Sequence, residues 1–198
     1  MRTIKERSLL RLFNLQIQRL NLRGCPQCLI QLFVCQRAQV IARAMSMRSE
    51  TANVPFLPVL PPQYRSIFDQ MSMVRKGPAR GVTTLEPSNI EYVLDTLPKP
   101  YYLFDIENGE ATRALNPIKA ATNIAKMGRT CLTEVEVIAL CVHSQVLARL
   151  DVFAMGCRYM HEEVPVLAIA SGHRPHLGSE SLWCGGCESA GTPSCQRT

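Results

Sequence analysis

Residues 101–128 read YYLFDIENGEATRALNPIKAATNIAKMG, and this stretch carries the sharpest structural signals in the chain. The run 101–106 is short and rich in aromatic residues, which is typical of a β-strand. Asn108-Gly109 then supplies the pair of residues that favours a tight hairpin turn. A return strand over 110–113 should follow. The stretch therefore predicts a hairpin leading into a helix.

Two helices are predicted downstream of this turn. Asn116-Pro117 combines an N-cap residue with proline at the first helical position, and Gly128 suits the left-handed residue just past a helix end. These signals bound a helix over 117–127. The sequence TEVE at 133–136 matches a capping box, which predicts a second helix over 134–148.

The expected fold class is α+β, with a small antiparallel sheet packed against helices. Val164–Ala170 is a short β-branched run with Ser171-Gly172 as its turn, which favours a strand. The last 25 residues are rich in Gly, Ser and Cys and read as a loop. The strands expected in the sheet are 101–106, 110–113, 151–155 and 164–170.

Residues 1–48 form a basic helical N-terminal region. They hold nine of the 22 Lys and Arg but one of the 16 Asp and Glu, a net charge of +8, whereas residues 49–198 carry −2. Apolar spacing predicts helices over 5–22 and 27–45. This region is either packed on the body or an extension, and its composition leaves organellar targeting open. Residues 49–198 are expected to form a single globular domain.

The proline-rich middle of the chain limits what can form there. Eight of the thirteen prolines fall between Pro55 and Pro100, which excludes long helices and central strands. We expect an edge strand over 54–60 and one short helix within 64–74.

Composition narrows the class of protein. Apolar residues make up 46% of the chain, enough for a buried core, and no apolar run approaches the ~20 residues of a membrane span. Because the positive charge is concentrated in residues 1–48, the sequence argues against a uniform nucleic-acid-binding surface. The basic N-terminal region is the one feature of the sequence that suits nucleic acid. Nine cysteines without a visible signal peptide favour reduced thiols and a cytoplasmic location.

The order of several motifs resembles an uncharacterised, mainly bacterial family of domains of unknown function. These motifs are a D-x-x-x-G-E turn at 105–110, a G-R-x-x-L-T helix start at 128–133, a G-S-R step at 156–158 and a terminal S-C at 194–195. Cys157 replaces the usual serine, and the loop 178–193 departs from the family pattern. The resemblance is clear over about 100–177 and at 194–195 and faint elsewhere. It implies one compact domain and assigns no activity.

Cys195 with His143 is a candidate nucleophile–base pair. A catalytic cysteine and histidine are often far apart in sequence and close in space. The alternative is that Cys195 is a small buried hydrophobic residue and that His143 flanks a buried helix face.

His176, Cys184, Cys187 and Cys195 are candidate ligands of a structural zinc ion, because three Cys and one His make a closed tetrahedral site. The sequence predicts no cofactor, and zinc is the one cofactor that it allows as a hypothesis. The alternative is that these cysteines lie in a variable loop without metal.

Arg158 and Asp105 are candidate ligand-binding residues. An arginine can clamp a carboxylate or phosphate with two hydrogen bonds, and Asp105 lies beside Glu107 and Glu110 near the expected turn. The alternative for Arg158 is a surface ion pair with Glu162 or Glu163. The alternative for Asp105 is a strand-end residue that bonds the backbone of the turn.

No complete catalytic constellation or nucleotide-binding motif is present in the sequence. The first functional hypothesis is therefore a non-catalytic binding or interaction module. A thiol-dependent enzyme using Cys195 and His143 is the alternative, and a zinc-stapled structural domain is the third.

Overall fold

The computed structural model describes residues 3–47, 54–94 and 97–197, and within them the fold is α+β as the sequence predicts. The α-helices in these residues are α1 (Ile4–Leu22), α2 (Gln27–Val34), α3 (Arg37–Ser46), α4 (Ile67–Met71), α5 (Pro117–Lys126) and α6 (Glu134–His143). Short 3-10 helices are η1 (Pro87–Asn89), η2 (Glu110–Thr112) and η3 (Val146–Ala148).

One sheet is wholly antiparallel and has the order β1-β6-β13-β7. Its central strand β6 is buried along its whole length, and the expected edge strand is confirmed as β1. The bounds are β1 (Val54–Val59), β6 (Tyr101–Glu107), β13 (Ser194–Gln196) and β7 (Thr130–Cys131). The C-terminal residues therefore pair with the middle of the chain.

The second sheet is mixed, because two of its strand pairs are parallel. Its main path is β12-β8-β10-β11-β4, and β5 pairs with β9, which in turn pairs with β10. The bounds are β12 (Ala190–Gly191), β8 (Asp151–Phe153), β10 (Glu163–Ala170), β11 (Arg174–Ser181), β4 (Val82–Thr83), β5 (Ile90–Tyr92) and β9 (Cys157–Tyr159). A separate small hairpin joins β2 (Arg75–Lys76) to β3 (Ala79–Arg80).

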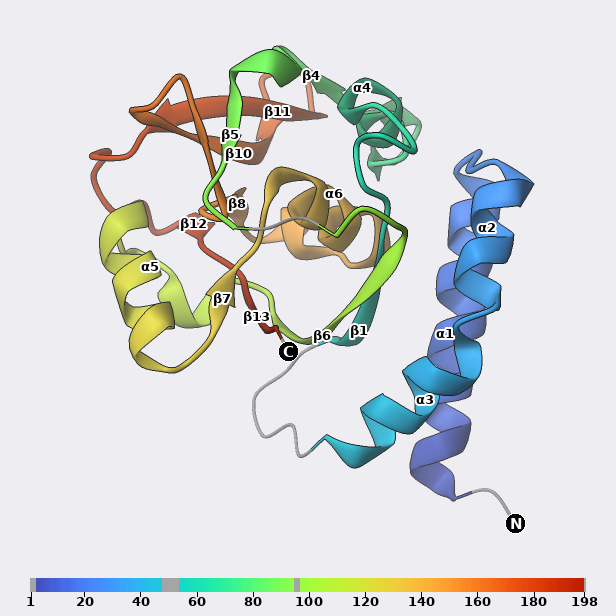
Figure 1. Cartoon of the computed structure of the whole chain (residues 1–198). Helices are drawn as coiled ribbons and strands as arrows, with labels where there is room; N and C mark the ends of the chain where they lie inside the picture. Colours follow the sequence, from blue (N-terminus) through green and yellow to red (C-terminus); the bar gives the residue numbers. More distant parts are fainter. Residues whose placement is uncertain (1–2, 48–53, 95–96, 198) are drawn as a thin grey trace.

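Helix α6 lies at the centre of the molecule, where it packs against β1 of one sheet and β10 of the other (Figure 1). Every residue from Glu134 to Val142 is buried. A helix that is apolar on all sides is stable in water only when other elements surround it, which explains its central place. Two glutamates nevertheless stand in its first turn.

Local signals place the starts of α5 and α6 correctly. The side chain of Asn116 accepts a hydrogen bond from the Lys119 N–H at 2.8 Å, and Gly128 has φ +67 just past the end of α5. At the start of α6, the Glu136 carboxylate accepts a hydrogen bond from the Thr133 N–H at 2.7 Å. These caps satisfy backbone groups that the helices leave unbonded.

The predicted hairpin at Asn108-Gly109 is wrong, because residues 110–112 form η2 instead of a return strand. The Glu107 carboxylate accepts hydrogen bonds from the N–H groups of Gly109 and Ala111, which curls the chain after β6. Gly109 has φ +101, as the turn residue should, but β6 takes β1 and β13 as its partners.

Two further boundaries differ from the sequence prediction. Helix α6 ends at His143 rather than at 148, because Ser144 is extended and its hydroxyl donates to the Leu140 carbonyl. The C-terminal segment is not a loop throughout. It contains β11, which pairs with β10 along all eight residues, and β12 and β13.

The N-terminal region folds as helices packed on the body, with the predicted second helix divided at Cys35-Gln36. The ring of Phe13 stacks on that of Tyr102 with centroids 5.9 Å apart, and Phe33 meets the same ring edge-on at 5.5 Å. The Gln16 side chain donates to the Phe56 carbonyl at 2.8 Å. These helices therefore bury part of the β1-β6 sheet. The boundary between residues 1–48 and 49–198 stays a prediction.

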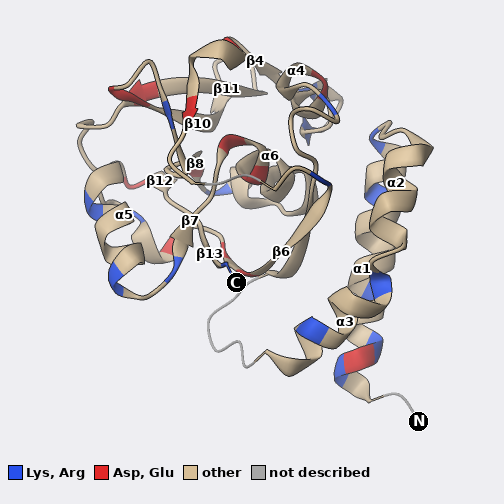
Figure 2. Ribbon diagram, in the orientation of Figure 1, with Lys and Arg blue, Asp and Glu red and all other residues tan. Residues whose placement is uncertain are grey.

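Basic positions are spread along these helices, with one acidic position near the start of α1 (Figure 2). The described residues contain no helix that has both the length and the apolar character needed to cross a membrane.

Candidate anion-binding pocket

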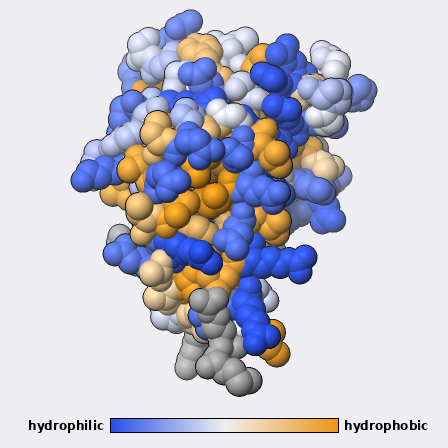
Figure 3. Space-filling model, turned by 90° about the vertical axis from the view of Figure 1, so that its right-hand side faces the viewer, coloured by the Kyte–Doolittle hydropathy of each residue, from blue (hydrophilic) through white to orange (hydrophobic). Residues whose placement is uncertain are grey.

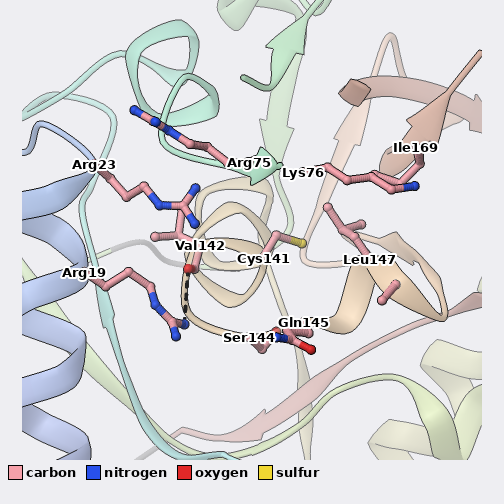
Figure 4. A pocket seen from close by; sticks show the side chains of 11 residues that line it. Arg19, Arg23, Arg75, Lys76, Cys141, Val142, Ser144, Gln145, Leu147 and Ile169 are labelled. Carbon is pink, nitrogen blue, oxygen red and sulfur yellow. Dashed lines mark hydrogen bonds between the residues drawn. The ribbon is translucent and has the colours of Figure 1, made fainter. Parts of the chain in front are cut away.

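A cavity of about 280 Å³ opens beside the C-terminal end of α6. Four segments that are distant in sequence line it: the C-terminal end of α1, β2, the end of α6 with the residues that follow it, and β10. Figure 4 shows Arg19 and Arg23 reaching toward the end of α6 from α1, with Lys76 extending toward Ile169 on the other side. The cavity therefore lies between the N-terminal region and the body.

Four cationic side chains line this cavity. Arg19 lies in the last turn of α1, and Arg23 is the C-cap residue of this helix four positions later. Arg75 and Lys76 come from β2, whose hairpin turns at Gly77 with φ +58. The three arginines are half-buried and the lysine is exposed.

The positive charge of the cavity is not balanced by carboxylates. None of the described residues that line it is acidic, and across residues 3–47, 54–94 and 97–197 the four cations form no ion pair. Burial lowers the pKa of Arg23, and the neighbouring charges of Arg75 and Arg19 lower it further. Like charges held this close repel one another, and a bound anion would relieve that repulsion.

Backbone carbonyls hold two of the arginines in place. Arg19 donates to the carbonyl of His143 and, at 3.5 Å, to that of Val142, so it caps the C-terminal end of α6. Arg23 donates to the Met73 carbonyl at 2.8 Å. A cation at the end of a helix is a common structural arrangement, which accounts for Arg19 but not for the other three.

Arg75 carries a donor that the fold leaves unused. Its Nε is buried and has no hydrogen-bond partner among the described residues. A buried polar group without a partner costs free energy, so such a group is expected where a ligand supplies the missing bond.

The rest of the lining is largely apolar. Cys141, Val142, Leu147, Ala148 and Ile169 contribute the apolar part, and Ser144 and Gln145 add two uncharged polar side chains. A pocket with an apolar wall and a few polar groups is the usual form of a small-molecule site. The arrangement suits a ligand with one anionic end and one apolar end.

His143 lies behind this pocket with both ring nitrogens buried and without partners in the described part of the chain. Burial, together with Arg19 and Arg23, lowers its pKa to about 3. The neutral imidazole therefore persists at neutral pH. Its place next to the basic pocket was not predicted from the sequence.

Cys195 lies at the other end of α6. It is fully buried in β13 near Glu136, and burial, followed by the charge of Glu136, raises its pKa to about 12. Glu136 and His143 are separated by seven residues of helix, about 10 Å along the axis. The structure does not bring the predicted nucleophile and base together, and a reactive Cys195 stays a prediction.

The predicted zinc ligands are also dispersed. His176 lies in β11, where its Nε2 is 3.3 Å from the Thr84 hydroxyl, whereas Cys195 lies in the other sheet. Cys187 is exposed and Cys184 half-buried. In the described residues, no group of three His, Cys, Asp or Glu side chains is placed to hold a metal ion. The zinc hypothesis receives no support from this geometry.

Asp105 and Arg158 take part in different local structures. Asp105 is buried within β6 at φ +53, and its carboxylate accepts a hydrogen bond from Arg129 at 2.6 Å. Arg129 also donates to the Ser194 hydroxyl at 2.8 Å, so it ties β6 to β13. Arg158 donates to the carbonyls of Met155 and Cys157. Neither candidate lines the basic pocket.

The first turn of α6 carries a second cluster of charged groups. Tyr101 donates to Glu136 at 2.6 Å, and Arg197 pairs with the same carboxylate at 2.6 Å. Tyr92 donates to Glu134 at 2.5 Å. Hydrogen bonds between protein groups account for Glu136, whereas Glu134 Oε2 is buried without a hydrogen-bond partner among the described residues. The cluster lines none of the cavities described here.

The four pocket cations were missed at the sequence level. The available signals were the spacing of Arg19 and Arg23 at four residues and the Arg75-Lys76 pair before a Gly-Pro turn. Neither is specific, because only the fold brings the two pairs together.

The structure thus defines an α+β protein with a small basic pocket. The chain belongs to a family of unknown function, DUF5701, which it matches over residues 26–182. Arg75, Lys76 and the α6 end of the pocket lie within the matched residues, whereas Arg19 and Arg23 precede them. No curated protein and no solved structure matches the chain.

Proposed function

We propose that this protein is a non-catalytic binding module and that the basic pocket takes a small organic anion. The observation that carries the proposal is the convergence of Arg19, Arg23, Arg75 and Lys76 on one cavity without a carboxylate among the described lining residues. Charged donors of this kind bind phosphate and carboxylate groups strongly when they are partly removed from water.

The remaining lining indicates the rest of the ligand. A volume of about 280 Å³ is at the small end of the range for ligand sites. The apolar wall formed by Val142, Leu147 and Ile169 suits a short hydrocarbon or a single ring. A phosphate monoester or carboxylate with such a group fits both the charge and the size.

Thermal unfolding of the full chain tests the proposal. Phenyl phosphate and benzoate carry an anion on a ring, phenol carries the ring alone, and inorganic phosphate carries the anion alone. A ligand that binds only the folded state raises Tm according to its affinity. We expect phenyl phosphate or benzoate to raise Tm more than inorganic phosphate, and phenol to have no effect at equal ionic strength.

A matched pair of variants locates the effect. Lys76→Gln removes one pocket cation, and Lys119→Gln removes an equal charge from an exposed position on α5 outside the pocket. We expect the Lys76→Gln protein to need about ten times more ligand for the same rise in Tm. The Lys119→Gln protein should need the same ligand concentration as the unmodified protein. Equal stabilisation of both variants would place the anion elsewhere and contradict the proposal.

A further inference from the structure

The outer face of the N-terminal helices carries a groove separate from the basic pocket. Its larger part is a hollow of about 550 Å³ between α1 and α3. An adjoining hollow of about 380 Å³ extends along the surface of α1. Leu10 and Arg37 line both parts, so the two form one continuous groove. Figure 3 shows this side of the molecule, with an apolar area surrounded by hydrophilic side chains.

The floor of the groove is a second apolar face of α3. Ala38, Ile41, Ala42 and Met45 recur at three- and four-residue spacing and line the hollow with Leu10 of α1. The core face of α3 consists of Val40, Ile41 and Ala44, so Ile41 belongs to both faces, and Leu10 and Met45 also pack against the core. The apolar surface of α3 therefore begins at the core with Ile41 and Met45 and continues to solvent at Ala38 and Ala42, which are exposed.

The rim of the groove is mainly basic, with Glu6 as the one acidic side chain among the described lining residues. Arg7 and Arg11 line it from α1, and Arg37 lines it from the start of α3. In the described part of the chain, none of these three arginines forms an ion pair with a carboxylate. An apolar floor with a basic rim is complementary to an amphipathic helix whose polar face is acidic.

We infer that this groove docks an acidic amphipathic helix of a partner protein. Three features favour that occupant over a lipid surface. The site is concave, its floor residues Leu10 and Met45 are half-buried, and Ile41 is buried. A bilayer would instead require apolar side chains that project outward. A second copy docked through the same face would bring two basic rims together, which like-charge repulsion opposes.

The probe for the inference is a synthetic helical peptide of about 18 residues, five helical turns, with Leu on one face and Glu on the other. Binding of the labelled peptide to the full chain is followed by fluorescence anisotropy. A peptide with Lys in place of Glu tests the charge complementarity. We expect the acidic peptide to bind and the basic peptide to fail.

Two substitutions of equal charge on α3 localise the site. Ala42→Glu places a carboxylate on the groove floor, and Gln39→Glu places one at an exposed position that does not line the groove. We expect Ala42→Glu to weaken peptide binding by at least about tenfold and Gln39→Glu to leave it within about twofold. If Ala42→Glu lowers Tm, Ala38→Glu, also exposed and on the floor, replaces it.

Equal binding by the Ala42→Glu and Gln39→Glu proteins would overturn the inference. It would also be overturned if vesicles containing phosphatidylglycerol bound the full chain while the acidic peptide did not. Neither outcome bears on the basic pocket, which shares no residue with the groove.

Discussion

Glu134 and Glu136 stand two positions apart in α6 and neither is exposed, yet their surroundings differ. Glu136 is paired with Arg197, accepts from Tyr101 and caps the Thr133 N–H. Glu134 accepts from Tyr92 but forms no ion pair among the described residues. Burial raises the pKa of Glu134 above its ordinary value.

The same substitution should therefore have opposite effects at these two positions. Glu136→Gln breaks a buried ion pair and should lower the free energy of unfolding by about 2 kcal/mol. Glu134→Gln removes a carboxyl whose folded pKa exceeds its unfolded pKa. The stability from that raised pKa is complete below the unfolded pKa of about 4.3 and is lost as pH rises through the folded pKa.

Urea unfolding of both variants checks this prediction. Relative to the unmodified protein, Glu134→Gln should become more stable as pH rises from about 5 to about 8, because Gln needs no proton. Destabilisation of similar size by both substitutions would show that Glu134 is bound as a carboxylate.

His143 provides a pH dependence of the opposite sign. Its folded pKa of about 3 lies below the unfolded value near 6.5, so the unfolded state binds more protons between these limits. Stability should fall as pH drops below about 6.5, by up to about 1.4 kcal/mol per pH unit.

His143→Phe should flatten that slope, because its ring does not titrate and the imidazole nitrogens have no partners to lose. His173→Asn is the control, since His173 is exposed at φ +61, a conformation that Asn tolerates. The comparison is made in denaturant melts at several pH values. An unchanged slope in His143→Phe would mean that the imidazole is solvated.

At the scale of elements, Arg129 connects β6 and β13, two strands that are distant in the sequence. It follows α5 and donates to Asp105 in β6 and to the hydroxyl and carbonyl of Ser194 in β13. The planar guanidinium makes these bonds together, whereas a lysine presents one nitrogen.

Arg129→Lys should lower the free energy of unfolding by about 3 kcal/mol, because a lysine cannot make all the hydrogen bonds that the guanidinium donates to Asp105 and Ser194. Arg113→Lys, at an exposed site, should change it by less than about 1 kcal/mol. Denaturant midpoints measure both. If Arg129→Lys lowers the free energy of unfolding no more than Arg113→Lys does, the backbone hydrogen bonds of β13 to its neighbouring strands hold it without Arg129.

The elements that the sequence predicts well are those with local signals. Asn116, Gly128 and the capping box at 133–136 mark helix ends through residues a few positions apart. β11 was missed, since RPHLGSES lacks a strand pattern and becomes a strand through its ladder with β10. The predicted hairpin at 108–109 does not form, because the Glu107 carboxylate accepts hydrogen bonds from the backbone N–H groups of Gly109 and Ala111.

At the scale of the whole molecule, the N-terminal helices contribute to both the core and the pocket. Phe13 and Phe33 pack on Tyr102, while Arg19 and Arg23 line the cavity. The sequence shows the net charge of residues 1–48, but it does not show that Arg19 and Arg23 line a pocket. Only the fold brings α1 next to β2 and the end of α6.

A chain that begins at Met47 should therefore lose most of its soluble yield, since removal of α1–α3 exposes Phe56 and Tyr102. The measurement is soluble yield and Tm beside the full chain. Retention of Tm within a few degrees would instead identify residues 1–46 as a dispensable extension.

The most direct test of the basic pocket is calorimetric titration of phenyl phosphate into the full chain at two salt concentrations. We predict one site per chain, affinity that weakens as salt rises from about 50 to about 200 mM, and loss of at least tenfold in Arg75→Gln. Removing Arg75 also relieves its repulsion of Arg23, so the unliganded variant should be no less stable at low salt. Absence of binding to the folded full chain, or equal affinity in Arg75→Gln, would contradict the account.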